Sequence, residues 1–148
     1  MEIGKEIKQS KFKSEYHKVV VNIIYTSGWL NSRNLSRLKP FGITPQQFNV
    51  LRILRGQHPK PATINLIIER MLDKSSNASR LVEKLRMKKL VERATCEEDR
   101  RAVNVIITEQ GLALLEKLDR EEERWNMDFA ISEEQASQLS DLLDQFRG

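Results

Sequence analysis

Residues 75–93 read SSNASRLVEKLRMKKLVER, and this stretch decides the fold. Its apolar residues recur at the three- and four-residue spacing that places side chains on one face of an α-helix: Ala78, Leu81, Val82 and Leu85. The polar run 73–76 precedes them and supplies a turn and a helix cap. We therefore predict a helix that runs to about Lys88 and buries its apolar face.

The opposite face of this helix is small, polar and basic, and it holds Ser76, Asn77, Ser79, Arg80, Glu83 and Lys84. Asn, Ser and Arg side chains hydrogen-bond the edges of bases, and Arg binds guanine with two hydrogen bonds. Glu83 fits a DNA-binding face less well than its neighbours. A carboxylate near phosphates lowers the affinity for DNA unless it accepts a hydrogen bond from cytosine or pairs with Arg or Lys. A helix face that is only solvated has a similar composition. The elements around the helix must therefore show whether this face binds DNA. The residues expected to bind double-stranded DNA in the major groove are Ser76, Asn77, Ser79, Arg80 and Lys84, and Ser75 is also expected to bind DNA.

Three helices are predicted before this one, at 15–38, 45–57 and 64–72. Pro40 and Gly42 end the first helix. Thr44 and Gln47 form a capping box at the start of the second, and Thr63 opens the third. The third helix is thus joined by a short polar turn to the helix that ends near Lys88.

The pattern changes after Leu90, because β-branched residues alternate with polar ones at 90–95 and 101–107. We predict two strands joined by an exposed, charged tip at 96–100. Thr108 caps a fifth helix, and Ser132 with Gln135 begins a sixth. Two short helices joined by a polar turn and followed at once by a β-hairpin are typical of a winged helix-turn-helix.

The predicted fold class is therefore mainly α (α+β): a winged helix-turn-helix core with a two-stranded β wing, plus N- and C-terminal helices that form a dimerisation region. We expect a single unit over 1–148, with the DNA-binding part at 44–107 and dimerisation helices at 1–40 and 108–148. The apolar residues assigned to the homodimer interface are Leu115, Leu118, Trp125, Phe129, Leu139, Leu142, Leu143 and Phe146.

Charge is distributed unevenly along the chain. The net charge is +4, but residues 1–101 carry +11 and residues 102–148 carry −7. A surface that binds a polyanion requires an excess of basic residues such as that of residues 1–101, although solvated helix faces also produce it. The sequence has no apolar run of membrane-spanning length and no secretory signal, and its single cysteine excludes an internal disulfide. We expect a cytoplasmic protein.

Four segments together resemble the MarR (multiple antibiotic resistance regulator) family of winged-helix transcription factors. They are SRLVEKL at 79–85, LVER at 90–93, DRR at 99–101 and VIITEQG at 105–111. The resemblance implies a homodimeric regulator, expected to be a repressor, on a pseudo-palindromic operator. It also implies that Arg101 enters the minor groove, that Asp99 holds it, and that Arg100 is a phosphate ligand. Lys89 departs from the family, which usually has glycine there; a left-handed backbone at this position would make lysine costly.

The same resemblance implies a small-molecule pocket between the dimerisation helices and the winged helix. Tyr25 and Trp29 are the candidate wall residues for a small aromatic effector, with a place in the dimer or domain core as the alternative. No cofactor and no metal are expected, because His17, His58 and Cys96 form no ligand motif. Cys96 as a redox sensor remains a minor alternative.

Two other function classes are considered. A winged helix that binds a protein partner would carry apolar residues on the outer face of the helix that ends near Lys88, and we expect none. A small hydrolase would need a nucleophile elbow, a phosphate loop or a Cys/His signature, and the sequence has none of these. We therefore predict a DNA-binding regulator and not an enzyme.

Overall fold

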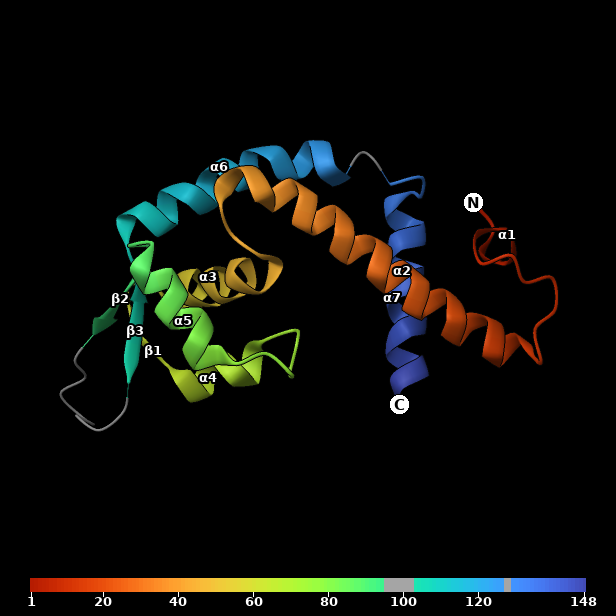
Figure 1. The fold of residues 1–148 in the computed structure, drawn as a ribbon, viewed down its shortest axis with the longest axis horizontal. Helices are drawn as coiled ribbons and strands as arrows, with labels where there is room; N and C mark the ends of the chain where they lie inside the picture. Colours follow the sequence, from red (N-terminus) through yellow and green to blue (C-terminus); the bar gives the residue numbers. More distant parts are fainter. Residues whose placement is uncertain (95–102, 127–128) are drawn as a thin grey trace.

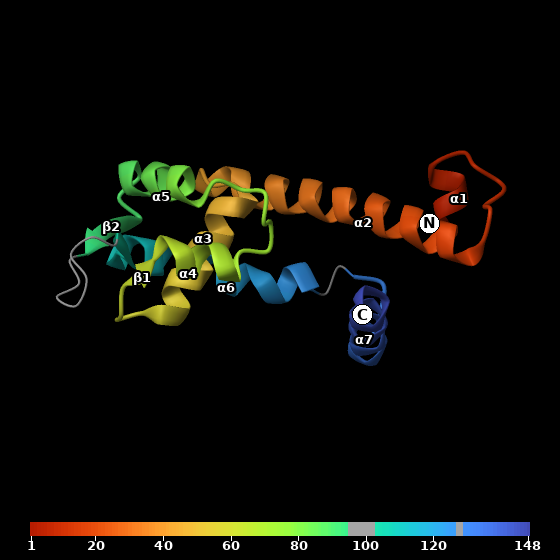
Figure 2. The same cartoon turned by 90° about the horizontal axis from the view of Figure 1, so that it is seen from below.

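The computed structural model describes residues 1–94, 103–126 and 129–148. Helices and strands follow in the order α1 (Ile3–Glu6), α2 (Glu15–Leu38), the short 3-10 helix η1 (Lys39–Phe41), α3 (Pro45–Gln57), β1 (Ala62–Thr63), α4 (Ile64–Arg70), α5 (Ala78–Met87), β2 (Val91–Ala94), β3 (Asn104–Ile107), α6 (Glu109–Asn126) and α7 (Glu133–Arg147). The helices α3, α4 and α5 and the sheet form a head at one end of the molecule (Figure 1, Figure 2). Helices α2 and α6 lead away from this head toward α7 and α1.

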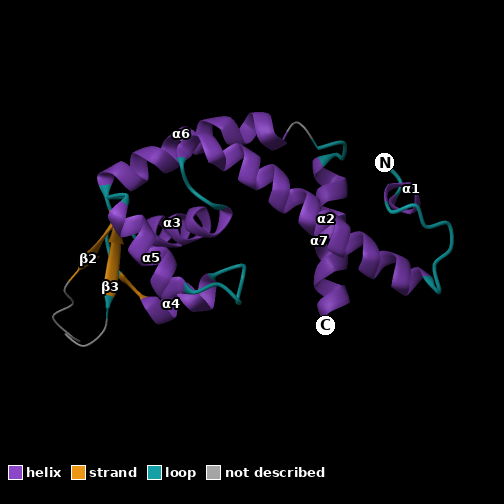
Figure 3. Cartoon of the chain, viewed as in Figure 1, coloured by secondary structure: helices purple, strands orange, loops and turns teal. Residues whose placement is uncertain are grey.

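The sheet is antiparallel, in the strand order β1-β3-β2 (Figure 3). Val91 pairs with Ile107, and Ala62 pairs with Val105. The two predicted wing strands are present as the pair β2 and β3, and β1 adds a third, unpredicted strand at the free edge of β3. A strand of two residues is too short to show any alternation, so the sequence pattern could not reveal it.

The predicted helix starts are confirmed by their caps. The Thr44 hydroxyl accepts from the backbone of Gln47, and the Gln47 side chain accepts from the backbone of Thr44; Ser132 and Gln135 repeat this box at α7. One start needs correction, because α5 begins at Ala78 with Asn77 as its cap. Ser76 and Asn77 therefore lie in the turn before the helix and not on its face.

The core of the head forms where α3, α5, α6 and the sheet meet. Leu51, Val105, Leu115 and Leu118 are all fully buried in it. This corrects the assignment of Leu115 and Leu118 to a dimer interface, because the first half of α6 closes the head of its own chain. No helix in the described part of the chain is long and apolar enough to cross a membrane.

Candidate nucleic-acid interface

Helix α5 has two chemically distinct sides, as predicted. Ala78, Val82 and Leu85 are buried against the head, whereas Ser79 and Arg80 are exposed. Lys84 is exposed one turn further along the helix. One expectation for this face is wrong: Met87, the last residue of α5, is 73% exposed, so an apolar side chain does lie beside the polar ones.

The turn before α5 is tightly hydrogen-bonded. The Asp73 carboxylate accepts from the Ser75 hydroxyl at 2.6 Å and from its backbone N–H at 3.0 Å, and these bonds lower the pKa of Asp73. The Oδ1 atom of Asn77 accepts from the Arg80 backbone at 3.0 Å. The helix cap thus occupies the Asn77 side-chain oxygen and leaves the amide nitrogen of that side chain to donate to another group.

Two further contacts hold the helix-turn-helix unit together. The Asn49 side chain of α3 accepts from the Leu72 backbone at 2.9 Å. The Lys74 ammonium group donates to the carbonyls of Ile68 and Glu69 at the end of α4, where helix carbonyls lack partners of their own. The sequence-based prediction treated residues 73–76 as a turn and as a cap for the following helix, and did not foresee that Lys74 caps the end of α4.

The Glu83 carboxylate is paired with two arginines, as a carboxylate on a DNA-binding face requires. Its two carboxylate oxygens accept from Nε and Nη2 of Arg86 at 3.0 and 2.7 Å. The guanidinium of Arg93 in β2 lies 3.8 Å from the same carboxylate. The Arg86 hydrogen bond, and then the charges of Arg86 and Arg93, lower the pKa of Glu83. Sequence reasoning missed both arginines as site residues, although the three-residue spacing of Glu83 and Arg86 is a helical ion-pair signal.

The predicted wing residues Asp99, Arg100 and Arg101, and also Cys96, lie outside the described residues. The bend that leads into the wing is described, and Lys89 has a φ of 61° there. Lys89 therefore has a left-handed backbone, at the position where the MarR family usually has glycine. The strands β2 and β3 leave this region as a pair, and Ala94 opposite Asn104 is the last registered pair among the described residues.

Tyr25 and Trp29 lie on α2, away from the head. The Tyr25 hydroxyl donates to the Glu6 carboxylate at 2.8 Å, and this bond raises the pKa of Tyr25. Trp29 meets Phe129 edge-on, and the Arg33 guanidinium lies 4.9 Å from the Trp29 ring centre and 4.7 Å from that of Trp125. Tyr25 therefore faces the Glu6 carboxylate, and Trp29 faces a cluster formed by Arg33 and aromatic rings.

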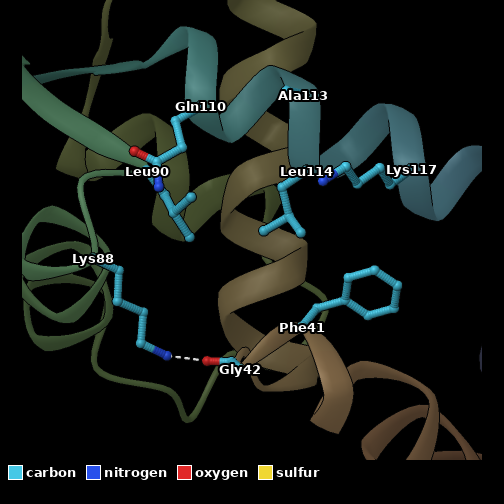
Figure 4. Close-up of a pocket in the computed structure, with 8 residues that line it drawn as sticks. All are labelled: Phe41, Gly42, Lys88, Leu90, Gln110, Ala113, Leu114 and Lys117. Atoms are coloured by element: carbon cyan, nitrogen blue, oxygen red, sulfur yellow. Dashed lines mark hydrogen bonds between the residues drawn. The ribbon is translucent and has the colours of Figure 1, made fainter.

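A separate open pocket of about 530 Å³ lies where the end of α5 meets η1 and the first half of α6 (Figure 4). The Lys88 ammonium group donates to the Gly42 carbonyl across its mouth. Tyr25 and Trp29 are not among its walls. The lining residues are Phe41, Gly42, Lys88, Leu90, Gln110, Ala113, Leu114 and Lys117.

Comparison with known proteins identifies this arrangement. A sequence model of the MarR family matches residues 41–102, which include α3, α4, α5 and β2. Residues 41–102 are therefore similar to the MarR family. MarR-family proteins are DNA-binding transcription regulators and not enzymes, which confirms the predicted function class and the winged-helix fold.

Individual relatives extend the likeness beyond the matched segment. The HTH-type transcriptional regulator MhqR of Bacillus subtilis (strain 168) is 28% identical over 127 residues, which cover 84% of this chain and 85% of MhqR. A solved complex of S. aureus MepR with DNA has a TM-score of 0.73 at 24% identity and covers 92% of this chain and 97% of MepR. Bordetella bronchiseptica BpsR, whose DNA binding is regulated by 6-hydroxynicotinic acid, has a TM-score of 0.65 at 19% identity and covers 86% of this chain and 99% of its own.

Proposed function

We propose that this protein is a homodimeric repressor that binds a pseudo-palindromic operator. The observation that carries the proposal is that α5 is amphipathic: it buries its apolar residues and exposes Ser79, Arg80 and Lys84. In this proposal 44–107 binds DNA, and 1–40 and 108–148 dimerise. Ser75, Ser76 and Asn77 approach the DNA from the turn that precedes the helix.

The dimer is supported by α7, a helix with no buried residue in this chain. Its apolar stripe is exposed at Leu139 (51%), Leu142 (61%) and Phe146 (50%). A stripe of this kind at helical spacing is costly in water and is normally covered by another surface. A two-fold partner would cover it with its own copy of the same helices, and would place two copies of α5 about one DNA turn (~34 Å) apart.

The DNA-binding role is tested by two substitutions on α5. Arg80→Ala should cost about 1 to 3 kcal/mol in binding and relax the preference at one base position. Lys84→Ala should weaken all sequences alike and reduce the salt slope by about one unit per subunit. Arg120→Ala on α6 is the matched control, since it also removes an exposed cation. Equal affinity of Arg80→Ala and the parent protein for a selected duplex would contradict the base-reading role.

The wing contributes Asp99, Arg100 and Arg101 in this proposal, with Arg101 in the minor groove, Asp99 holding it and Arg100 on a phosphate. Asp99→Ala is informative because removal of a carboxylate near DNA should tighten binding by electrostatics alone. Weaker binding by a folded Asp99→Ala, together with a larger loss for Arg101→Ala, would support the role; the opposite sign would contradict it.

Release by a small aromatic effector is the remaining part of the proposal. BpsR, a structural relative, is regulated by 6-hydroxynicotinic acid, so this acid is the first probe. Displacement of a labelled duplex by the acid would be followed by fluorescence anisotropy. Tyr25→Phe with Trp29→Phe, compared with Lys117→Gln in the open pocket, would show which of the two regions mediates the response. Duplex binding that is insensitive to aromatic acids would contradict effector release of this type.

A further inference from the structure

Glu83 is an acidic residue on the DNA-facing side of α5, and its carboxylate joins two elements. It accepts two hydrogen bonds from Arg86 of the same helix, and it lies 3.8 Å from the Arg93 guanidinium of β2. Figure 1 shows β2 next to the end of α5. One carboxylate thus links the helix proposed to read bases with the first strand of the wing.

The two arginines keep donors available for a second partner. A guanidinium carries five N–H donors in a planar fork. Arg86 uses Nε and one Nη2 donor on Glu83, and its side chain is still 47% exposed; the Arg93 side chain is 70% exposed. Each arginine can therefore bind Glu83 with one edge and a DNA phosphate with another. The three side chains together carry a net charge of +1, so they still attract a polyanion.

We propose that Glu83 is a positioning residue that holds Arg86 and Arg93 as paired phosphate ligands and so fixes α5 against the wing strand. An unrestrained arginine must lose rotamer freedom when it binds a phosphate, and a guanidinium already held by a carboxylate loses less. The inference rests on the proposed DNA binding and names three residues that the major-groove and wing assignments do not include.

Glu83→Gln tests the inference because two explanations predict opposite signs. A carboxylate with no positioning role only repels phosphates, so its removal should tighten DNA binding and steepen the salt dependence. A positioning carboxylate should instead give about three- to tenfold weaker binding on removal, with a shallower salt slope, because the arginines bind phosphates less well. Exposed ion pairs contribute little to folding, so the variant should retain its circular dichroism spectrum.

Glu92→Gln is the matched control. Glu92 is an exposed carboxylate on β2, next to Arg93, and it has no ion pair among the residues that the structure describes. Its removal changes the charge by the same amount near the same strand, and should leave binding unchanged or slightly tighter. Glu83→Asp keeps the charge on a shorter side chain, so it should recover part of the affinity lost in Glu83→Gln and serves as the second variant.

The decisive comparison places Glu83→Gln in a chain that already carries Arg86→Gln and Arg93→Gln. Affinity is measured by fluorescence anisotropy over a range of salt, on a short duplex selected from a random pool by the parent protein. The loss caused by Glu83→Gln should disappear in that background, since nothing is left for the carboxylate to position. A loss that persists there, or tighter binding by Glu83→Gln in the parent chain, would overturn the inference. Failure of the parent protein to select any duplex would instead overturn the proposed function, and the inference with it.

Discussion

The hydroxyl of Thr108 donates a hydrogen bond of 2.8 Å to the carbonyl of Lys89, so the start of α6 is joined to the bend that follows α5. The Thr108 backbone donates to Leu90, and its hydroxyl oxygen accepts from Gly111 at 3.1 Å. The bend is left-handed at Lys89, with a φ of 61°. This contact therefore sets how the proposed reading helix stands relative to α6 and the sheet.

Lys89→Gly should raise the free energy of unfolding by about 1 kcal/mol, because glycine adopts a left-handed backbone without the Cβ strain that lysine has. Urea unfolding would measure this change. Lys89→Ala is the control, since it removes the same side chain but keeps the Cβ. If Lys89→Ala stabilised the protein as much as Lys89→Gly, the gain would come from the lysine side chain and not from the backbone.

Gly111→Ala should destabilise the protein by about 1 to 3 kcal/mol or prevent folding. A Cβ at this position would meet Cγ1 of Ile107 at 2.7 Å and would come closer still to the Leu90 carbonyl oxygen. Gly56→Ala in α3 is the matched control, because a Cβ there meets nothing within 4 Å. That variant should keep or slightly raise stability, by at most about 1 kcal/mol. Comparable melting of both variants would contradict the packing argument.

Leu142→Glu should convert the proposed dimer into a monomer of 17.3 kDa. The substitution places a charge in the middle of the apolar stripe of α7, where a partner would have to desolvate it. Light scattering over a range of concentrations measures the mass, and Ser140→Glu on the same helix is the control. A parent protein that is already monomeric at all concentrations would contradict the dimer itself.

The carboxyl group of Glu83 should titrate below its ordinary pKa of 4.5, because Arg86 and Arg93 favour its charged form. A carboxyl whose pKa is lowered by folding stabilises the native state above its unfolded pKa, and this contribution is lost as the pH falls through the folded value. Carboxyl-carbon NMR over the acid range would measure it. In Arg86→Gln the pKa should move back toward 4.5, and an unchanged value would show that Arg86 is not the main cause.

Local sequence chemistry predicted most of the helices and the outward face of α5. The cap residues Thr44, Thr63 and Ser132 and the apolar spacing act within a few neighbours, so each helix start can be read from the chain alone. The segments within 79–111 indicated the resemblance to the MarR family and the DNA-binding class for the same reason. Each of these motifs is a short, continuous stretch of sequence, so it can be recognised without the tertiary structure.

The tertiary structure decided what depends on residues far apart in sequence. It buried Leu115 and Leu118 in the head, where the sequence pattern had suggested a dimer surface, because an apolar stripe does not say which partner covers it. It paired β1 with β3 and brought Arg93 to Glu83 across the bend at Lys89. Helical periodicity determines which side of a helix is apolar, whereas chain reversal and strand registry determine which distant side chains meet there.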